Sequence, residues 1–485
     1  MTPSTLSRRT TPALLAILIA GCASTHGLSP HSTLRDVDRL STAESLSKAD
    51  VSPPAWPDAE WWESLGDPNL DALITTALEG TPSLDAADAR LRKALAQAGL
   101  AEAGLKPTLG ASASHTHINV PESLPEPIGG TTVGSTMLSL RFDWSPDLWG
   151  GKRARYYAAL GAVRASEAEA QAARVMLAGN IAHTWVALSQ AYAMQDVAVA
   201  ESQRNVGLRK LSEQRVRAGI DNRIALVQIE SAEAAARAQA GAAAQQIEAL
   251  RNALAMLAGQ GPDFGLTLSR PQLYAPSLHV PSVLPSDLVS RRADITAARW
   301  RVEAASQSIK ASKADFYPTI NLAARAGVVG SSLSSLFKSE STFAYASPAI
   351  TLPIFDGGRL RNQLAGSNAD FDLAIAHYDQ TVLNALREVI DATQSARSLE
   401  LQISDARRAR DAAEKSASLM LQRRQAGLAN QLDVLDAQRP LLQLNQQLAV
   451  LEARRIDSAV NLDIALGGGL PAATLPESND KPASP

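Results

Sequence analysis

Cysteine is almost absent from this chain, because Cys22 is the only one in 485 residues. Disulfides therefore cannot stabilise the fold, which must depend on packing. The lone cysteine follows Ile19–Gly21, at the end of a short apolar run that begins after Arg8 and Arg9. A basic start, an apolar stretch and small residues before a cysteine are the order of a bacterial lipoprotein signal. We expect cleavage after residue 21 and acylation of Cys22 by a diacylglyceryl group and an N-acyl chain.

The residue after the cysteine indicates where the lipoprotein goes. Ala23 stands there instead of Asp, and in bacterial lipoproteins this is typical of export to the outer membrane. Several acyl chains anchor a protein firmly, whereas one chain binds marginally. The alternative is an ordinary secretory signal with an incidental cysteine.

Several other features are missing, and each absence excludes a class of protein. No apolar run of 18 or more residues follows Cys22, so no membrane-spanning helix is expected. The net charge is −3 and no stripe of Lys and Arg stands out, which argues against nucleic acid as a partner. The chain has no nucleophile elbow, no Gly-rich phosphate loop and no His/Cys metal cluster. We therefore expect neither an enzyme nor a bound metal or cofactor.

The chain repeats itself once, which is the main feature of its organisation. Matching stretches occur in the same order at offsets of 207 to 211 residues, and these pairs are Leu84–Ala87 with Ile295–Ala298, Lys106–Leu109 with Tyr317–Ile320, Gly150–Lys152 with Gly357–Arg359, and Arg217–Ile220 with Gln425–Leu428. The predicted boundaries are a signal peptide at 1–21, an acylated linker segment at 22–61, the first repeat at 62–261, a Pro-rich linker without sustained helix at 262–283, the second repeat at 284–469 and a disordered tail at 470–485.

Each repeat contains two predicted strands. Leu138, Leu140, Phe142 and Trp144 alternate with Ser139, Arg141 and Asp143, which is the period of a strand with one apolar and one wet face. Its partner begins at Pro107, and the second repeat has similar strands at about 320–325 and 350–354. Loops rich in Gly, Ser and Pro, at about 121–134 and 330–341, join the strands of each pair.

Very long helices follow the strands. No proline occurs between Pro146 and Pro262, and Lys152–Arg217 is rich in good helix formers. About 66 residues at a rise of 1.5 Å make a rod of about 100 Å, which cannot bury itself in one compact domain. Apolar residues recur at spacings of three and four, as in a coiled-coil seam, and these are Ile181, Trp185, Leu188 and Tyr192 in one helix and Leu441, Leu444, Leu448 and Leu451 in another. Gly219 and Gly427 interrupt the pattern at equivalent places, which predicts the turns of two helical hairpins.

Four amphipathic strands in an exported chain leave two sheet edges open. Open edges are not tolerated in hydrocarbon, and closed outer-membrane barrels need at least about eight strands. Three copies supply about twelve strands, and cyclic symmetry closes the ring. We expect an α+β membrane protein, a trimer with a 12-stranded β-barrel that is continued by a coiled-coil barrel of long helices.

The residues also resemble a known family. The chain is similar over nearly its whole length to the TolC-like outer-membrane efflux factors, in the lipidated branch called NodT or OprM-like. The stretches that carry the resemblance are Trp61-Trp62, Asp67–Ile74, Leu284–Leu288, Arg291–Ile295, Phe316–Pro318 and Phe355–Gly358. The family usually has Arg-Pro-Asp-Ile where this chain has Arg292–Ile295, a departure that concerns local turn geometry only.

The resemblance implies a homotrimeric, passive exit duct for drugs or other small toxic solutes in the outer membrane. A periplasmic adaptor, also called a membrane fusion protein, would dock on the helical tips. An inner-membrane transporter, of the RND type, would supply the energy. Three alternatives are the outer-membrane factor of a type I protein secretion system, a periplasmic adaptor and a structural coiled-coil lipoprotein. An adaptor normally has one helical hairpin, and the duplication argues against it.

Asp433 and Asp436 are the candidate site of this duct. A spacing of three places both carboxylates on one helix face just after Gly427. In TolC-like proteins the corresponding aspartates form rings at the closed periplasmic end of the tube. Ala225 and Gln228 stand at the equivalent positions of the first repeat, so only the second repeat would supply the ring. On charge pattern alone, these two residues are a solvated helix face.

Histidine and tryptophan supply the remaining candidates. His115 and His117 alternate on one predicted strand, where they form either the start of a metal site or, as we favour, a polar strand near the outer rim. We expect His183 to pack between helices. The same is expected of a group of tryptophans that precedes the first helix, as an alternative to a membrane-interface belt; these are Trp56, Trp61 and Trp62.

Overall fold

The computed structural model describes residues 24–40, 44, 51–52, 56–123, 125, 127, 129–220, 222–276, 280–281 and 286–470. The predicted signal peptide, Cys22 and residues 471–485 lie outside these ranges. Two compact units are present. The first unit comprises residues up to 34, 91–165 and 298–378, and the second comprises 35–90, 166–297 and 379 onward.

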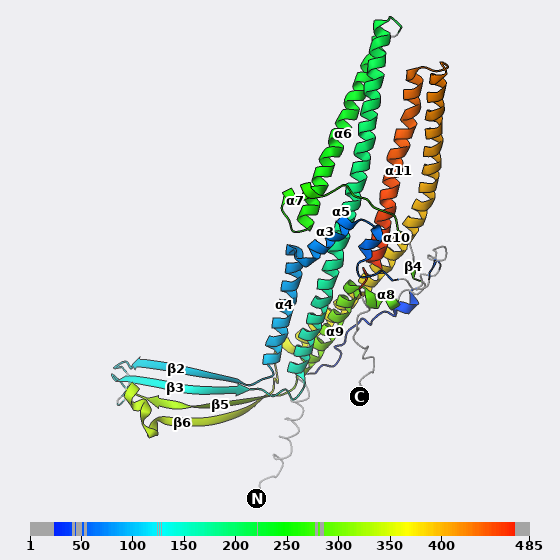
Figure 1. Ribbon diagram of the computed structural model, residues 1–485. Coiled ribbons are helices and arrows are strands. Elements are labelled where there is room, and N and C mark those ends of the chain that lie inside the picture. Colours follow the sequence, from blue (N-terminus) through cyan, green and yellow to red (C-terminus); the bar gives the residue numbers. More distant parts are fainter. Residues whose placement is uncertain are drawn as a thin grey trace. The chain divides into compact units, whose positions relative to one another are not determined.

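The two halves of the chain fold with the same order of elements (Figure 1). In the first half these are α3 (Pro68–Glu79), α4 (Pro82–Ala103), β2 (Thr108–Asn119), β3 (Thr132–Trp144), α5 (Gly151–Arg217) and α6 (Arg223–Leu257). In the second half they are α8 (Ser286–Arg291), α9 (Ala293–Ala314), β5 (Thr319–Gly330), β6 (Thr342–Thr351), α10 (Arg359–Gln425) and α11 (Gln431–Ala465). The internal duplication predicted from the sequence is therefore present in the fold.

The long helices have the predicted extent. α5 and α10 are each 67 residues long, and α6 and α11 are each 35. The start of α5 at Gly151 and its end at Arg217 lie within one residue of the prediction. Gly150 and Gly357 have φ values of +74° and +66° where the strand region gives way to helix, a backbone conformation that favours glycine.

The first unit contains one antiparallel sheet with the strand order β2-β3-β5-β6. β2 pairs with β3 in the first hairpin, and β5 pairs with β6 in the second. The pairing of β3 with β5 joins the two hairpins. β6 ends at Thr351, two residues before Pro353; proline cannot donate to a strand ladder. Four strands are present as predicted and form one sheet, but β6 spans Thr342–Thr351, so Leu352–Ile354 of the segment predicted at about 350–354 lie after its end.

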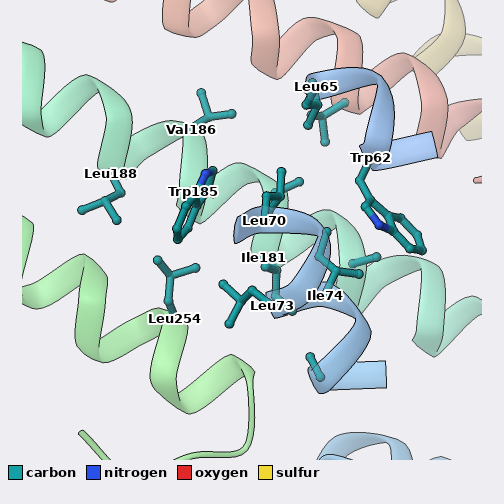
Figure 2. Close-up of a cluster of buried hydrophobic side chains, with 14 of the residues drawn as sticks. Trp62, Leu65, Leu70, Leu73, Ile74, Ile181, Trp185, Val186, Leu188 and Leu254 are labelled. Atoms are coloured by element: carbon teal, nitrogen blue, oxygen red, sulfur yellow. The ribbon is translucent and has the colours of Figure 1, made fainter. Parts of the chain in front are cut away.

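The core of the second unit lies where α3 packs on the long helices (Figure 2). Ile181, Trp185 and Leu188 of α5 are completely buried there, which confirms the predicted apolar seam of this helix. Leu70 and Ile74 of α3 are also completely buried in this cluster. Burial of one such side chain contributes roughly 2 kcal/mol.

One buried carboxylate ties this core together. Asp67 caps the N-terminus of α3 by accepting a hydrogen bond from the amide of Asn69 at 3.0 Å. Its second oxygen accepts from Trp185 Nε1 at 2.9 Å and from the amide of Gln272 at 2.7 Å. The Asn69 side chain also donates to Asp67, at 3.2 Å, so three residues supply four hydrogen bonds to this buried carboxylate and offset the cost of its desolvation. Asp67 thereby joins the start of α3, the middle of α5 and the linker.

The linker between the repeats contains structure that the sequence did not predict. α7 (Pro262–Thr267) is a helix of six residues that begins at a proline, the first helical position that proline favours. Farther along, β4 (Val280–Pro281) pairs in parallel with β1 (Val51–Ser52). Short helices of the 3-10 type are η1 (Val37–Arg39), η2 (Trp61–Leu65), η3 (Leu333–Phe337) and η4 (Ser339–Ser341).

Candidate functional site

The strand register aligns the apolar positions of β3 with small apolar residues of the other strands. Leu140 lies opposite Ala111 on β2 and Ala326 on β5, and Ala326 lies opposite Ala344 on β6. One position along, Arg141 lies opposite Gly110 and Arg325. Because successive side chains alternate between faces, Leu140 shares one face with these alanines, and Arg141 shares the other face with Gly110 and Arg325. The division is not complete, because the register places His115 and His117 on the face of Leu140 and Phe343 on the face of Arg141.

Charged side chains on the polar face are held in place. The guanidinium of Arg141 donates to both carboxylate oxygens of Asp143, at 2.5 Å and 3.1 Å. Arg325 is the cross-strand partner of Arg141 and of Tyr345. The predicted alternation places Arg141 and Asp143 on one face opposite Leu140, and the register adds Arg325 to that face.

The two strand histidines do not gather metal ligands around them. His115 Nδ1 forms a hydrogen bond with Thr136 Oγ1 at 2.8 Å across the β2–β3 pair. His117 lies opposite Gly134. In the part of the chain that the structure describes, no three His, Cys, Asp or Glu side chains are grouped as a metal site requires.

Both helical hairpins turn at the predicted glycines. Gly219 and Gly427 have φ values of +71° and +72°. At each turn the residue after the glycine donates to a carbonyl five residues back, at 2.9 Å from Ile220 and 2.8 Å from Leu428. A left-handed glycine followed by an amide that donates to a carbonyl five residues earlier is the Schellman motif, a common end of a helix. An asparagine then begins the next helix in both hairpins, Asn222 for α6 and Asn430 for α11.

Asp433 and Asp436 both lie in the first two turns of α11. Asp433 is partly buried, and its carboxylate accepts a hydrogen bond from the Asn430 amide at 2.8 Å. The Asn430 side chain in turn accepts from the Asp433 amide at 3.1 Å, so the two residues form a reciprocal capping box. Asp436 is exposed. Asp433 therefore has a structural role that the sequence analysis did not identify, and Asp436 presents the freer carboxylate.

A buried polar cluster lies beside these aspartates, on α5. Arg204, with 7% of its side chain exposed, donates to Glu201 at 2.7 Å and 2.9 Å and to the carbonyl of Leu435 at 3.2 Å. Asn205 donates to Glu201 and to the carbonyl of Ala232 on α6, both at 3.3 Å. The cluster therefore joins three helices, and sequence reasoning missed it because its members are far apart in the chain.

The electrostatics of this cluster favour the ionised carboxylate. The hydrogen bond from Arg204 is the main cause that holds the pKa of Glu201 below its usual value, against the opposing effect of burial. The hydrogen bond from Asn205 and the charge of Arg439 on α11 act in the same direction. Glu201 thus remains an anion that fixes the Arg204 guanidinium.

A cavity of about 830 Å³ is lined by residues of α5, α10 and α11 together with Arg292 and Asp294. His183 Nδ1 is 2.9 Å from the Asp457 carboxylate at its wall, so His183 does more than pack between helices. Arg292 also lines the cavity and donates to Glu388 at 2.7 Å and to the carbonyl of Ala465 at 3.1 Å. The lining combines charges of both signs with apolar side chains such as Met176 and Leu399.

Comparison with known proteins decides the family. The model of the family described as outer membrane efflux protein matches residues 73–260 and, a second time, residues 284–468. This chain belongs to the outer membrane efflux protein family. The two matches begin and end close to the two repeats found in the sequence.

Relatives of this family cover nearly the whole chain. The multidrug resistance outer membrane protein MdtP of Escherichia coli K12 is 30% identical over 95% of this chain and 96% of its own length. The fusaric acid resistance protein FusA of Burkholderia cepacia is 33% identical over 73% of this chain and 68% of its own. The outer membrane protein VceC of Vibrio cholerae, a crystal structure, has a TM-score of 0.77 at 36% identity, over 85% of this chain and all of that one.

Membership of the efflux family settles the predicted class. The chain is an outer-membrane efflux channel protein with the TolC-like fold, which confirms the predicted fold class, function and localisation. The adaptor and scaffold alternatives are excluded, because the family model matches both repeats. Among the helices that the structure describes, none is long and apolar enough to cross a membrane.

The family's usual proline is replaced in this chain without loss of the turn. α8 ends at Arg291 and α9 begins at Ala293, so the helix break falls at Arg292 although no proline follows it. Arg292 donates to both oxygens of Asp294, at 3.0 Å and 2.7 Å, and this interaction holds the break.

The tryptophans near the N-terminus pack as predicted. Trp61 and Trp62 are 3% and 7% exposed and belong to the core of the second unit. Trp56 lies under the guanidinium of Arg291, 4.5 Å from the ring centre. In these positions the rings stabilise helix packing, and a membrane-interface belt is not their role.

Proposed function

We propose that three copies of this chain form one passive conduit across the outer membrane, with a barrel of twelve strands. The observation that carries the proposal is the pair of sheet edges. Neither β2 nor β6 has a second strand beside it among the described residues, and every residue of β2 is exposed. Open edges are not tolerated in hydrocarbon, and a cyclic trimer pairs β6 of one copy with β2 of the next.

The polar face of the sheet would then line a water-filled lumen. Arg141, Asp143 and Arg325 are on this face, and Leu140 and Phe142 are on the face toward lipid. Nothing in this arrangement calls for chemistry on the solute, so we propose a conduit without enzymatic activity, cofactor or metal. The names of MdtP and FusA support drugs and small toxic acids as solutes.

Asp433 and Asp436 are the proposed constriction of the conduit. Both lie just after the hairpin turn at Gly427, at the end of the helices where the chain reverses. Three copies would place six carboxylates around one opening, which favours cations. The resemblance to TolC-like proteins supports this position, and the exposure of Asp436 agrees with it.

The remaining parts of the proposal concern anchoring and partners. Acylation of Cys22 would add a lipid anchor in the outer membrane. A periplasmic adaptor would dock on the hairpin ends, and an inner-membrane transporter of the RND type would supply the energy. Both partners are inferred from the resemblance to TolC-like factors.

Single-channel recording in planar bilayers tests the conduit and its constriction together. We expect the purified trimer to conduct ions and to prefer cations. A structural lipoprotein without a channel would give no conductance. Neutralising the ring, with Asp433→Asn and Asp436→Asn, should lower the cation conductance and move the reversal potential in a KCl gradient toward zero, because the carboxylates that attract cations are removed. Glu230→Gln removes an exposed carboxylate near the start of α6 and is the matched control. Unchanged conductance and selectivity in the double variant would refute the constriction.

A further inference from the structure

We propose that Arg204 is a positioning residue for the constriction, because it holds the acidic first turns of α11 against α5. This inference rests on the proposed role of Asp433 and Asp436. Arg204 belongs to the first helical hairpin, and the carbonyl that it binds, at Leu435, belongs to the second. The guanidinium therefore fixes the residue between the two aspartates.

The guanidinium is itself held rigidly. Glu201, one turn earlier on α5, accepts from Arg204 Nε and Nη2, so both edges of the fork are engaged. The remaining nitrogen, Nη1, is the one that donates to Leu435. A buried guanidinium cannot leave such partners without exposing an unpaired charge, and its position therefore defines that of the Leu435 backbone.

Apolar contacts bring α11 close enough for this hydrogen bond. Val434 and Leu435 are 4% and 7% exposed. Gly207 lies on α5 beside Leu435, and a Cβ atom at position 207 would be 3.8 Å from a Leu435 methyl group. The side of α11 that carries Val434 and Leu435 is therefore packed, while Asp436 remains exposed.

A proline removes one of the backbone hydrogen bonds that connect the first turns of α11 to the rest of the helix. Pro440 lies inside the helix and has no amide proton, so the carbonyl of Asp436 lacks its usual donor within the helix. Helices bend at such positions. The segment Gln431–Arg439 consequently depends on lateral contacts for its position, and Arg204 provides a charged hydrogen bond among them.

A second arginine cluster on α5 gives a matched control. Arg209 lies five residues after Arg204 and pairs with Glu233 at 2.7 Å and with Glu213. Glu233 is on α6 and Glu213 is on α5, so both of these ion pairs lie within the first hairpin. Loss of Arg209 removes the same charge from the same helix without releasing the constriction.

The experiment compares Arg204→Gln and Arg209→Gln as trimers in planar bilayers. We expect Arg204→Gln to raise the open probability at low voltage about tenfold, the effect of losing one hydrogen bond to a charged group, and to lower cation selectivity. Arg209→Gln should leave both unchanged. Thermal melts of the two trimers measure the stability that each variant loses. If Arg204 and Arg209 both had only a structural role, the two variants would lose similar stability and would conduct alike.

Glu201→Gln and the double aspartate variant separate the role of Arg204 from that of the constriction. Glu201→Gln leaves Arg204 in place but loosens it, so a smaller change in the same direction is expected even if Arg204→Gln does not assemble. If Asp433→Asn with Asp436→Asn alters conduction while Arg204→Gln and Glu201→Gln behave like Arg209→Gln, the inference is wrong and the constriction stands. If the double aspartate variant changes nothing, the constriction and the inference fail together.

Discussion

Single charged side chains fix the meeting points of helices in the second unit. Arg292 is 8% exposed and binds two carboxylates and the carbonyl of Ala465 near the end of α11. Asp67 is completely buried and accepts four hydrogen bonds from three residues, Asn69, Trp185 and Gln272. In both cases several partners surround the charge, and removing one partner would leave a buried charge that is incompletely paired.

Asp463 on α11 is a different case, because burial raises the pKa of its carboxyl to about 7. It lines a cavity together with Trp61 and Glu63. The folded protein therefore holds a proton on Asp463 between about pH 4 and pH 7 that the unfolded chain has already released. The free energy of unfolding consequently falls as the pH rises through this window, and the full penalty is present above pH 7.

Replacing Asp463 by Asn should remove this pH dependence. We expect the wild-type protein to lose about 2 kcal/mol more than Asp463→Asn between pH 5 and pH 8, since one pKa unit corresponds to about 1.4 kcal/mol. Denaturant unfolding at the two pH values measures the difference. Asp370→Asn, which changes an exposed carboxylate of α10, is the control. Equal pH profiles for wild type and Asp463→Asn would show that Asp463 is ionised in the fold.

Among the elements, the helical hairpins depend on their turns. Gly427 has a φ of +72° and open space around it, so the cost of a side chain there comes from the backbone alone. Gly241 lies in the interior of α6, also in open space, and its φ is not positive. The two glycines therefore respond to alanine in opposite directions.

We expect Gly427→Ala to destabilise the trimer by about 1 kcal/mol per protomer, because left-handed backbone is unfavourable for alanine. Gly241→Ala should stabilise it by about 0.5 to 1 kcal/mol, the difference in helix propensity. Thermal melts of the purified protein measure both shifts. A rise in melting temperature for Gly427→Ala would contradict the hairpin turn.

Periodic elements could be predicted from the sequence, and interactions between distant residues could not. Strand alternation and helix formers predicted β3 and α5, because their signals repeat over many residues. The bond from Arg204 to Leu435 joins positions 231 residues apart, and no local pattern marks either partner. The β1–β4 pair was missed because two-residue strands have no periodicity. Asp433 was found as an acid on a helix face, but its capping role depends on Asn430 being the N-cap.

At the scale of the whole molecule, two devices would hold the proposed trimer in the outer membrane. The first is the acyl anchor at Cys22, which remains a prediction, and the second is the barrel itself. A closed barrel satisfies every strand edge and buries an apolar face in lipid without help from an anchor. Acyl chains add affinity for the bilayer but form no strand pairs.

A Cys22→Ser form that is still exported should therefore assemble into trimers and conduct like the acylated protein. Crosslinking of outer-membrane fractions measures assembly, and planar bilayers measure conductance. An Asp433→Asn, Asp436→Asn form that keeps Cys22 separates the two effects, since it should keep its acyl anchor and trimer while its conductance changes. Complete loss of trimer in Cys22→Ser would mean that the acyl anchor is required before the strand edges can pair, and the barrel would then not be sufficient for assembly.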